Sequence, residues 1–292
     1  EELAGLLGQL SCEVRFESSR MTIRSWGFKP QGDMLYVKSE RSSQFASSLL
    51  LNAWNLERPV FVVLRGMSTP AYFSMTRNFV EYLGMKIEGL GPELQLLKWQ
   101  VVTKSGMIIE PDLSSAFSLA ACAVVDGSAT ILNFPMKSLQ PDAVFVEHLQ
   151  AMGASVRRTD DKITFEKTEK LKPLNANLKN QPDLFPVLAA LCALADGTSV
   201  LNGAEQLQFK ESNRLEKVQE LLTLCGIVTR PVPGGLEIDG QPDLTRRVPK
   251  KYGVPFSVDQ DHRMAMAAAV LMKAGYPLQV DDREVVNKSF PG

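Results

Sequence analysis

The sequence predicts an α/β protein built from repeats of a βαβαββ unit, with buried helices and outer sheets. Two observations support this prediction. A helix that ends at a small residue and is followed by a short strand recurs along the chain. A second pattern, a helix rich in small residues followed by a turn and a strand, alternates with the first. Recurrence at a fixed interval is typical of a repeated structural unit.

The first pattern gives the length of the unit. Its helices end at Ser11, Gly84, Gly153 and Gly226, which are 73, 69 and 73 residues apart. Gly commonly follows a helix because the chain passes through a left-handed conformation there. We therefore expect left-handed breaks at these positions and a unit of about 70 residues.

The second pattern predicts the buried helices. Its copies are residues 43–64, 115–132, 183–201 and 262–280. Small side chains occur on several faces of these helices, so we expect close packing on all sides. Hairpins are expected at residues 160–165 and 234–238, and they complete the unit of strand, helix, strand, helix, strand, strand.

The chain length suggests two domains. With 292 residues, the chain is long enough for two domains or one large one. A proline and the restart of the repeat place the boundary between Met107 and Pro111, which gives domains of residues 1–108 and 109–292. The first residue is not Met, and we expect a chain truncated at its N-terminus and slightly at its C-terminus, with an incomplete first domain.

Composition excludes several classes of function. The net charge of −1 provides no global attraction to nucleic acid or to an anionic membrane. No apolar run reaches the roughly 20 residues of a membrane span, and no signal peptide is evident. The 4 cysteines lack CxxC spacing and there are 2 histidines, so we expect free thiols, a cytoplasmic protein and no metal site.

The first candidate site is a short charged segment. Lys210 and Arg214 flank Glu211 at the expected opening of a helix. Residues four apart lie on one helix face, and helix N-termini attract anions. This segment could therefore bind a phosphate or a carboxylate. The alternative is an exposed helix start with mixed charges.

Polar residues also open the small-residue helices, where equivalent repeats should face one side. They are Ser42, Ser43, Gln44, Asp112, Asp183, Asp261, His262 and Arg263. The alternative for the serines and aspartates is a simple N-cap. The Arg263 guanidinium can hold an anion bidentately, unless it forms a salt bridge with Asp261. Lys288 is a further cation, or else a solvated loop lysine.

At these residues the sequence resembles the 5-enolpyruvylshikimate-3-phosphate (EPSP) synthases. Residues 210–214 read KESNR, 261–266 read DHRMAM, 42–45 read SSQF and 288–291 read KSFP. Similar motifs occur in that family in the same order, and the resemblance spans nearly the whole chain. It implies two domains, each of three βαβαββ units, in the inside-out α/β barrel arrangement of the enolpyruvyl transferases.

The resemblance also implies an activity. The reaction is transfer of the enolpyruvyl group of phosphoenolpyruvate to the 5-hydroxyl of shikimate 3-phosphate, with release of phosphate, in aromatic amino acid biosynthesis. No cofactor or metal is implied. The partners are these small molecules, without nucleic acid or membrane, and the protein is expected to be a monomer. Glyphosate is expected to compete with phosphoenolpyruvate.

The family's functional residues match particular positions here. The implied catalytic residues are Asp183, Glu211 and Lys210. Shikimate 3-phosphate is expected at Ser42, Ser43, Gln44, Ser68, Asp183, Gln206 and Lys210. Phosphoenolpyruvate is expected at Gln44, Arg214, Arg263 and Lys288, with His262 as a further candidate. As a hypothesis, Asp183 takes the proton of the 5-hydroxyl and Glu211 transfers a proton at the enolpyruvyl carbon.

The sequence also departs from the family. Gln206 stands where Asn is common, and Ala71 separates Pro70 from Tyr72. The family's Lys-Ser-x-Ser-x-Arg and Gly-Asn-x-Gly-Thr segments are absent, so we expect little or no turnover by this chain alone. Two alternatives remain open. One is a UDP-N-acetylglucosamine enolpyruvyl transferase, and the other is a non-catalytic, anion-binding remnant.

Overall fold

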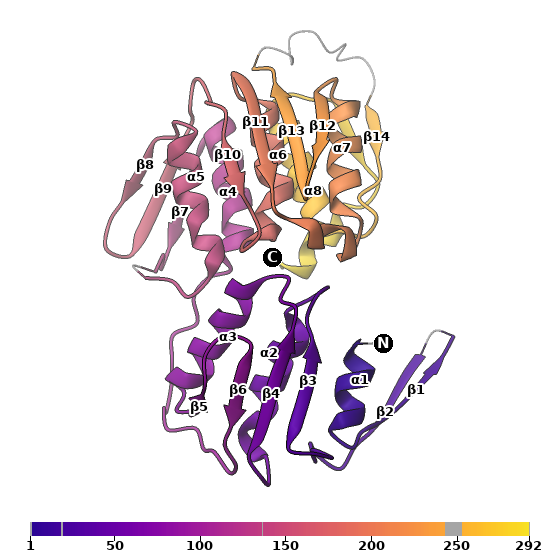
Figure 1. Cartoon of the computed structure of the whole chain (residues 1–292). Helices are drawn as coiled ribbons and strands as arrows, with labels where there is room; N and C mark the ends of the chain where they lie inside the picture. Colours follow the sequence, from indigo (N-terminus) through magenta and orange to yellow (C-terminus); the bar gives the residue numbers. More distant parts are fainter. Residues whose placement is uncertain (1, 19, 136, 243–252, 292) are drawn as a thin grey trace. The chain divides into compact units, whose positions relative to one another are not determined.

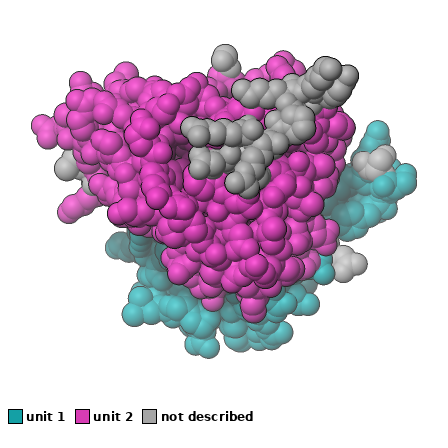
Figure 2. Space-filling view, turned by 90° about the horizontal axis from the view of Figure 1, so that it is seen from above, with its two compact units in different colours: residues 1–108 teal, residues 109–292 magenta. Residues whose placement is uncertain are grey.

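The computed structural model describes residues 2–18, 20–135, 137–242 and 253–291. The chain divides into two compact units, unit 1 with residues 1–108 and unit 2 with residues 109–292. Figure 1 labels their helices and strands, and Figure 2 colours the two units separately. The fold is mixed α/β, as the sequence predicts.

Unit 1 combines a four-stranded sheet, a separate hairpin and helices. Its helices are α1 (Glu2–Gln9), α2 (Gln44–Asn52) and α3 (Pro70–Tyr82), with the 3-10 turn η1 (Ala53–Asn55). Its strands are β1 (Glu13–Glu17), β2 (Arg20–Arg24), β3 (Met34–Lys38), β4 (Val60–Arg65), β5 (Ile87–Glu88) and β6 (Glu93–Leu96). The sheet order is β3-β4-β6-β5, and β1 and β2 form a separate two-stranded sheet.

The described residues of unit 2 form three sheets. Its helices are α4 (Leu113–Val125), α5 (Phe145–Ala151), α6 (Phe185–Ala193), α7 (Arg214–Leu224) and α8 (His262–Lys273). Short 3-10 turns are η2 (Pro141–Val144), η3 (Pro182–Leu184), η4 (Glu205–Phe209) and η6 (Glu284–Lys288). The strands are β7 (Ser128–Leu132), β8 (Val156–Arg158), β9 (Lys162–Glu166), β10 (Asn175–Asn177), β11 (Gly197–Asn202), β12 (Val228–Val232), β13 (Gly235–Gly240), β14 (Val254–Phe256) and β15 (Leu278–Val280). The sheets run β7-β9-β8, β10-β11-β13-β12 and β14-β15.

The predicted βαβαββ unit is confirmed in both parts of the chain. The order β3-α2-β4-α3-β5-β6 in unit 1 matches β10-α6-β11-α7-β12-β13 in unit 2. In each copy the first two strands are parallel, and the last strand pairs antiparallel with both the second strand and its hairpin partner. The same sheet topology therefore recurs in two separate sequence segments.

The predicted helix breaks are also confirmed. Backbone φ is +61° at Ser11, +112° at Gly84, +90° at Gly153 and +75° at Gly226. At each break the next residue donates its N–H to a carbonyl five residues earlier, in the Schellman pattern. These bonds, each 2.9 Å long, are Cys12 to Leu7, Met85 to Val80, Ala154 to Leu149 and Ile227 to Leu222. The repeat is thus visible at the level of single hydrogen bonds.

The buried-helix prediction is correct for unit 2 and wrong for unit 1. Helices α4, α6 and α8 pack against one another, and every residue of α6 is buried. Their sheets lie outside them (Figure 1). In α2, however, the buried residues are Ala46, Leu49 and Leu50. This face packs against α3 and β3, and the other faces of α2 are not covered to the same degree.

Cysteine chemistry and membrane spans were also part of the sequence prediction. All four cysteines are free thiols; Cys12, Cys192 and Cys225 are buried, and Cys122 is half-buried. Burial raises the pKa of Cys192 to about 12. Within the described ranges, none of the helices has both the length and the apolar character needed to cross a bilayer.

Candidate active site

The N-terminal ends of several unit 2 helices meet at one cluster of charged side chains. The cluster includes Asp183 from η3, which leads into α6, and Arg214, the first residue of α7. Asp261 and Arg263 come from the start of α8, and Ser114 comes from the start of α4. Because the repeat places helix starts alike, residues far apart in sequence come together here.

Arg214 is the centre of this cluster, and its side chain is 2% exposed. Its Nε and Nη2 donate to the two oxygens of Asp261 at 2.8 and 3.1 Å. Nη1 donates to Asp183 at 2.9 Å, and Nη2 also donates to Glu211 at 2.9 Å. Burial alone would lower the pKa of Arg214, but the carboxylates outweigh it and raise that pKa. Three carboxylates from separate segments therefore share one buried cation.

Lys210 also belongs to the cluster, but a loop and not the expected helix positions it. The prediction that it shares a helix face with Arg214 is wrong, because η4 ends at Phe209 and Lys210 is extended, with ψ −164°. Helix α7 begins at Arg214, and the side chain of Asn213 caps it. Lys210 Nζ nevertheless lies 3.3 Å from Asp183 Oδ1. The loop before α7, rather than the helix, brings the two cations together.

Asp183 faces three cations. Its side chain is 22% exposed, and it contacts Lys210, Arg214 and Arg263 at 3.3, 2.9 and 3.8 Å. Burial would raise the pKa of Asp183, but the three positive charges outweigh burial and lower the pKa to about 2. Asp183 is therefore a carboxylate at neutral pH.

Glu211 joins Arg214 to Lys288. Its Oε1 accepts from Lys288 Nζ at 2.7 Å, while its other oxygen accepts from Arg214. The Glu211 side chain is 33% exposed and that of Lys288 is 54% exposed. Burial opposes ionisation, but the Lys288 hydrogen bond and the Arg214 charge lower the pKa of Glu211 to about 2. Lys288 is thus ion-paired at the site, not an isolated loop lysine.

Arg263 is buried and only partly satisfied. Its side chain is 6% exposed, and Nη2 donates to Ser114 Oγ at 2.5 Å. Its Nε and Nη1 have no hydrogen-bond partner among the described residues. Unpaired guanidinium N–H groups are costly to bury, so such groups often mark a place where a ligand supplies the acceptor. Their acceptors would be the oxygens of a phosphate or carboxylate.

Asp261 orders the start of α8. Its carboxylate caps the helix by accepting the backbone N–H of Arg263 at 3.0 Å. The alternative of a side-chain salt bridge between these residues is wrong, because Asp261 holds Arg214 instead and also accepts from Ser212 at 2.9 Å. His262 is buried, and burial together with the neighbouring arginines lowers its pKa. It is therefore neutral at pH 7.

Two further predicted positions can be placed in unit 2. Asp112 caps α4, which was the alternative considered for it, by accepting the N–H groups of Ser114 and Ser115. Gln206 is a buried residue of η4, and its Nε2 donates to the Lys179 carbonyl at 3.1 Å. Gln206 therefore has at least one structural partner within unit 2.

The unit 1 candidates follow the C-terminal ends of the parallel strands β3 and β4. Ser42, Ser43 and Gln44 follow β3 at the start of α2, and the Ser42 hydroxyl accepts the Gln44 N–H at 3.2 Å. Ser68 follows β4, which is parallel to β3. The Ser68 N–H donates to the Ser39 carbonyl at 2.9 Å, so the two loops touch. Unit 1 thus brings its polar candidates to one place.

Three contributors were missed by the sequence reasoning. Asp261 was considered as a helix-opening residue, as an N-cap and as a salt-bridge partner of Arg263, but not as a partner of Arg214, and no hydrogen bond to Asp261 or Arg263 was expected from Ser212 or Ser114. Each forms hydrogen bonds within the cluster. The signal for Asp261 was its position immediately before two polar residues at a helix start, but nothing in sequence specifies which arginine it binds.

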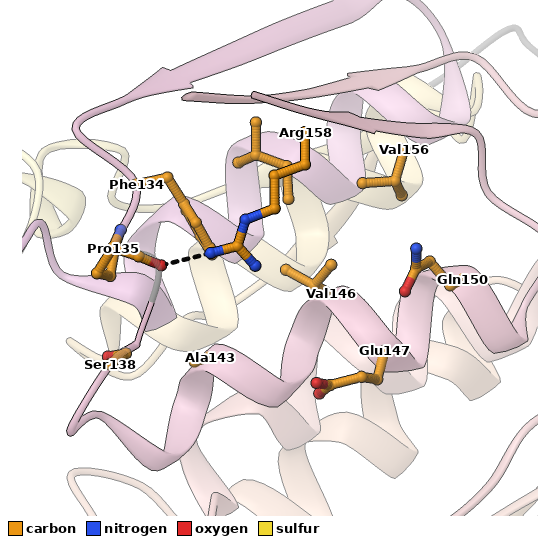
Figure 3. Close-up of a pocket in the computed structure, with 10 residues that line it drawn as sticks. Phe134, Pro135, Ser138, Ala143, Val146, Glu147, Gln150, Val156 and Arg158 are labelled. Carbon is orange, nitrogen blue, oxygen red and sulfur yellow. Dashed lines mark hydrogen bonds between the residues drawn. The ribbon is translucent and has the colours of Figure 1, made fainter. Parts of the chain in front are cut away.

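A separate hollow in unit 2 contains none of the predicted site residues. It has a volume of about 310 Å³, and Val146, Val156 and Ile163 are among its lining residues. Arg158 extends over the Phe134 ring and donates to the Pro135 carbonyl at 2.7 Å (Figure 3). Among the residues that line this hollow, Arg158 is the one with a positively charged side chain, and its guanidinium is already hydrogen-bonded. The cluster around Arg214 is the stronger candidate for chemistry.

Comparison with known proteins identifies the family. The family model for EPSP synthase (3-phosphoshikimate 1-carboxyvinyltransferase) matches residues 5–292. The chain belongs to the EPSP synthase family. A 3-phosphoshikimate 1-carboxyvinyltransferase of Pyrococcus abyssi is 32% identical over 282 residues, covering 96% of this chain and 65% of the relative. One of Methanoculleus marisnigri is 32% identical over 297 residues, covering 99% of this chain and 68% of the relative.

Solved structures support the same fold. The EPSP synthase of Acinetobacter baumannii matches with a TM-score of 0.74 and 21% identity, over 100% of this chain and 68% of that one. The enolpyruvyl transferase NikO of Streptomyces tendae matches with a TM-score of 0.67 and 17% identity, over 99% and 70%. The chain thus spans about two thirds of the length of these EPSP synthase relatives.

Proposed function

We propose that the protein carrying this sequence transfers the enolpyruvyl group of phosphoenolpyruvate to the 5-hydroxyl of shikimate 3-phosphate. The observation that supports this most is the buried, half-satisfied Arg263 beside Asp183 within a cluster of alternating cations and carboxylates. Such a cluster suits substrates that bring two phosphates and a carboxylate. Family membership supports the choice of reaction.

Phosphoenolpyruvate is proposed to bind among the cations of the cluster. Arg263 offers two unpartnered nitrogens, and Lys288 is half-exposed and paired with Glu211. Arg214 differs, since its side chain is 2% exposed and four of its N–H bonds reach carboxylates. Direct contact with Arg214 would need one of those carboxylates to move. Its charge acts on the substrate in either case, because the site is partly shielded from water.

For shikimate 3-phosphate, two separate sets of polar residues are proposed as contacts, one within each unit. In unit 2 these are Asp183, Gln206 and Lys210, and in unit 1 they are Ser42, Ser43, Gln44 and Ser68. Gln44 is also proposed to contact phosphoenolpyruvate. Serine hydroxyls and the Lys210 ammonium donate to phosphate oxygens, while the Asp183 carboxylate accepts from ring hydroxyls. His262 is kept as a further candidate contact.

The carboxylates are proposed to move the protons. The 5-hydroxyl oxygen bonds to C2 of the enol phosphate as C3 gains a proton, and then the C2–O bond to phosphate breaks as C3 loses a proton. Asp183, a carboxylate at neutral pH, is suited to accept the hydroxyl proton. Glu211, with a pKa of about 2, is ionised at neutral pH and has no proton to donate while Lys288 is paired with it. A substrate phosphate that takes over Lys288 would raise the pKa of Glu211 toward a useful value.

The cluster could also stabilise the intermediate of the proposed reaction. The addition passes through a tetrahedral carbon that bears both the phosphate and the new ether oxygen. Fixed positive charges stabilise the phosphate and carboxylate groups that this carbon bears, and they need not reorganise during the reaction. Arg214 is held by three carboxylates and cannot easily move, so it suits such a fixed role.

Phosphate release tests the proposal. With both substrates, the protein carrying this sequence should release phosphate, and Asp183→Asn and Glu211→Gln should each lower kcat by roughly a hundredfold or more. Asp259→Asn, a nearby exposed carboxylate, is the control and should change little. The 292-residue chain covers about two thirds of the length of the EPSP synthase relatives, and we expect it to show little or no turnover by itself. Near-normal turnover in either active-site variant would remove that residue from its role.

The same assay separates the alternatives. Phosphate release with UDP-N-acetylglucosamine, and not with shikimate 3-phosphate, would support the other enolpyruvyl transferase. Anion binding without turnover in the longest natural form of the protein would support a non-catalytic role. Competition by glyphosate against phosphoenolpyruvate is the expected result for the proposed activity.

We further propose a monomeric protein that acts in the cytoplasm. The four free thiols fit a reducing compartment. The small-molecule substrates require no protein, nucleic acid or membrane partner. Sedimentation equilibrium tests the first point, where a dimer would contradict it, and cell fractionation tests the second.

A further inference from the structure

We propose that Ser114 is a positioning residue for Arg263, and that Asp112 fixes the direction of the Ser114 hydroxyl. The proposal deepens the proposed function, because it concerns the orientation of a residue expected to bind phosphoenolpyruvate. It adds Ser114 of α4 and its N-cap Asp112 to a site otherwise formed at the starts of α6, α7 and α8.

The geometry is a relay of three side chains. Asp112 Oδ1 accepts from the Ser114 hydroxyl at 2.6 Å, and Ser114 Oγ accepts from Arg263 Nη2 at 2.5 Å. A hydroxyl has one donor and two acceptor lone pairs. Because its proton points to Asp112, Ser114 presents a lone pair to the guanidinium.

Asp112 is itself firmly held. It accepts the backbone N–H groups of Ser114 and Ser115 at 3.0 and 3.2 Å, and the Ser115 hydroxyl at 2.9 Å. Burial opposes ionisation, but these hydrogen bonds and the charge of Arg263 lower the pKa of Asp112. The acceptor at the far end of the relay is therefore a carboxylate fixed to the start of α4.

The relay uses one nitrogen of Arg263 and leaves the other two without an acceptor in the described part of the chain. Ser114 holds Nη2, while Nε and Nη1 have no hydrogen-bond partner among the described residues. A planar guanidinium that is fixed at one nitrogen has the direction of its other N–H groups fixed as well. Ser114 thus determines where Arg263 can meet an anion.

A second contact joins α4 and α8 next to the relay. One turn further along α4, the Ser118 hydroxyl lies 3.1 Å from Met266 Sδ of α8. Ser118 is as buried as Ser114, at 8% and 7% exposure, but it touches a thioether instead of a guanidinium. Ser118→Ala is therefore a matched control for Ser114→Ala.

The first test is NMR of protein labelled with ¹⁵N-arginine, with the Arg263 signals assigned by Arg263→Lys. Restricted rotation about the Nε–Cζ bond should give separate Nη1 and Nη2 signals for Arg263 in the native chain. Ser114→Ala should merge them, while Ser114→Thr, which keeps the hydroxyl, and Ser118→Ala should not. Merged signals in the native chain, separate signals in Ser114→Ala, or merging in Ser114→Thr would each overturn the proposal.

Asp112→Asn gives a second, independent variant. An amide in this position still offers an oxygen to the helix N–H groups but no longer binds the serine hydroxyl as a carboxylate does. It should increase the rotation rate of the Arg263 guanidinium, as Ser114→Ala does but less strongly. An unchanged rotation rate would show that the Asp112 carboxylate does not direct the Ser114 hydroxyl, and would overturn the role proposed for Asp112.

Titration with phosphoenolpyruvate in the presence of shikimate 3-phosphate links the relay to binding. Ser114→Ala should weaken phosphoenolpyruvate binding roughly tenfold, as expected for a lost hydrogen bond to a charged group. Ser114→Thr should restore binding, and Ser118→Ala should match the native chain. Normal affinity in Ser114→Ala would overturn the proposal. If the native chain binds neither substrate, the proposed function fails, while the guanidinium signals still decide the role of Ser114.

Discussion

Arg214 and Asp261 form a two-point ion pair, with Nε–Oδ2 and Nη2–Oδ1 distances of 2.8 and 3.1 Å. Their side chains are 2% and 0% exposed, so the pair is shielded from solvent. The residues are 47 positions apart, and the pair joins the first residue of α7 to the N-cap of α8. The candidate site is thus built around a structural contact of unit 2, and site geometry and stability are coupled.

Asp261→Asn should destabilise unit 2 by about 3 kcal/mol, because loss of one partner leaves a buried charge less compensated. The amide oxygen can still cap α8, so the loss reports mainly on the ion pair. Chemical denaturation followed by circular dichroism measures the free energy of unfolding. Asp259→Asn is the control, since Asp259 is 48% exposed and should contribute under about 1 kcal/mol. Equal effects of both changes would contradict a central role for the pair.

Lys288→Met should raise the pKa of Glu211 from about 2, because it removes the hydrogen bond from the Lys288 ammonium. Arg214 remains, so the pKa should stay below that of an ordinary glutamate. The ¹³C shift of the Glu211 carboxyl, assigned with Glu211→Gln and followed against pH, measures this directly. Lys217→Met, which removes a lysine of α7 paired with Glu220 and Asp259, should leave the curve unchanged. An unchanged pKa in Lys288→Met would show that the pair is absent in solution.

Asp183 should make stability depend on pH in acid. Its pKa is lowered from 3.8 to about 2, so its ionised form stabilises the fold above about pH 4. This stabilisation should disappear as the pH falls from about 4 to about 2, because the folded carboxyl then takes up its proton. The difference in free energy of unfolding between the native chain and Asp183→Asn should narrow over this range. A constant difference across that range would contradict the lowered pKa.

Gly153→Ala should cost about 1 kcal/mol through backbone conformation alone. Gly153 has φ +90°, and an added Cβ would meet its nearest neighbours at 3.8 Å, which is ordinary contact. Gly153→Asn should cost less, since Asn tolerates the left-handed region better. Thermal or chemical unfolding compares the two variants. Equal losses for Ala and Asn would show that space, not the left-handed break, limits this position.

The regular features of this fold could be predicted from sequence because they depend on local chemistry. The left-handed breaks at Gly84, Gly153 and Gly226 follow from the need to end a helix, and glycine marks each one. The burial of α6 follows from a helix that is apolar on every face. Burial of α2 was predicted wrongly, because small residues show that a helix can be packed closely but not which elements surround it.

The candidate site could be predicted only in part. The charged residues themselves were visible in sequence, since residues 210–214 place two cations and a carboxylate at an expected helix start. Their pairing was not, because Asp261 could reach either Arg263 or Arg214 and only the fold selects the latter. The position of Lys210 was also misjudged, since a 3-10 turn that ends at Phe209 leaves no periodic pattern. The Ser114 relay depends on two helices 149 residues apart and has no local signal.

The most direct test of the account is calorimetric titration of the chain with phosphoenolpyruvate in the presence of saturating shikimate 3-phosphate. We predict saturable binding that weakens roughly tenfold or more in Arg263→Lys, where the planar fork is lost but the charge is kept. Arg230→Lys, at an exposed ion pair on β12, should bind as the native chain does. Absence of binding in the native chain, or equal affinity in Arg263→Lys, would contradict the claim that this cluster holds the substrate.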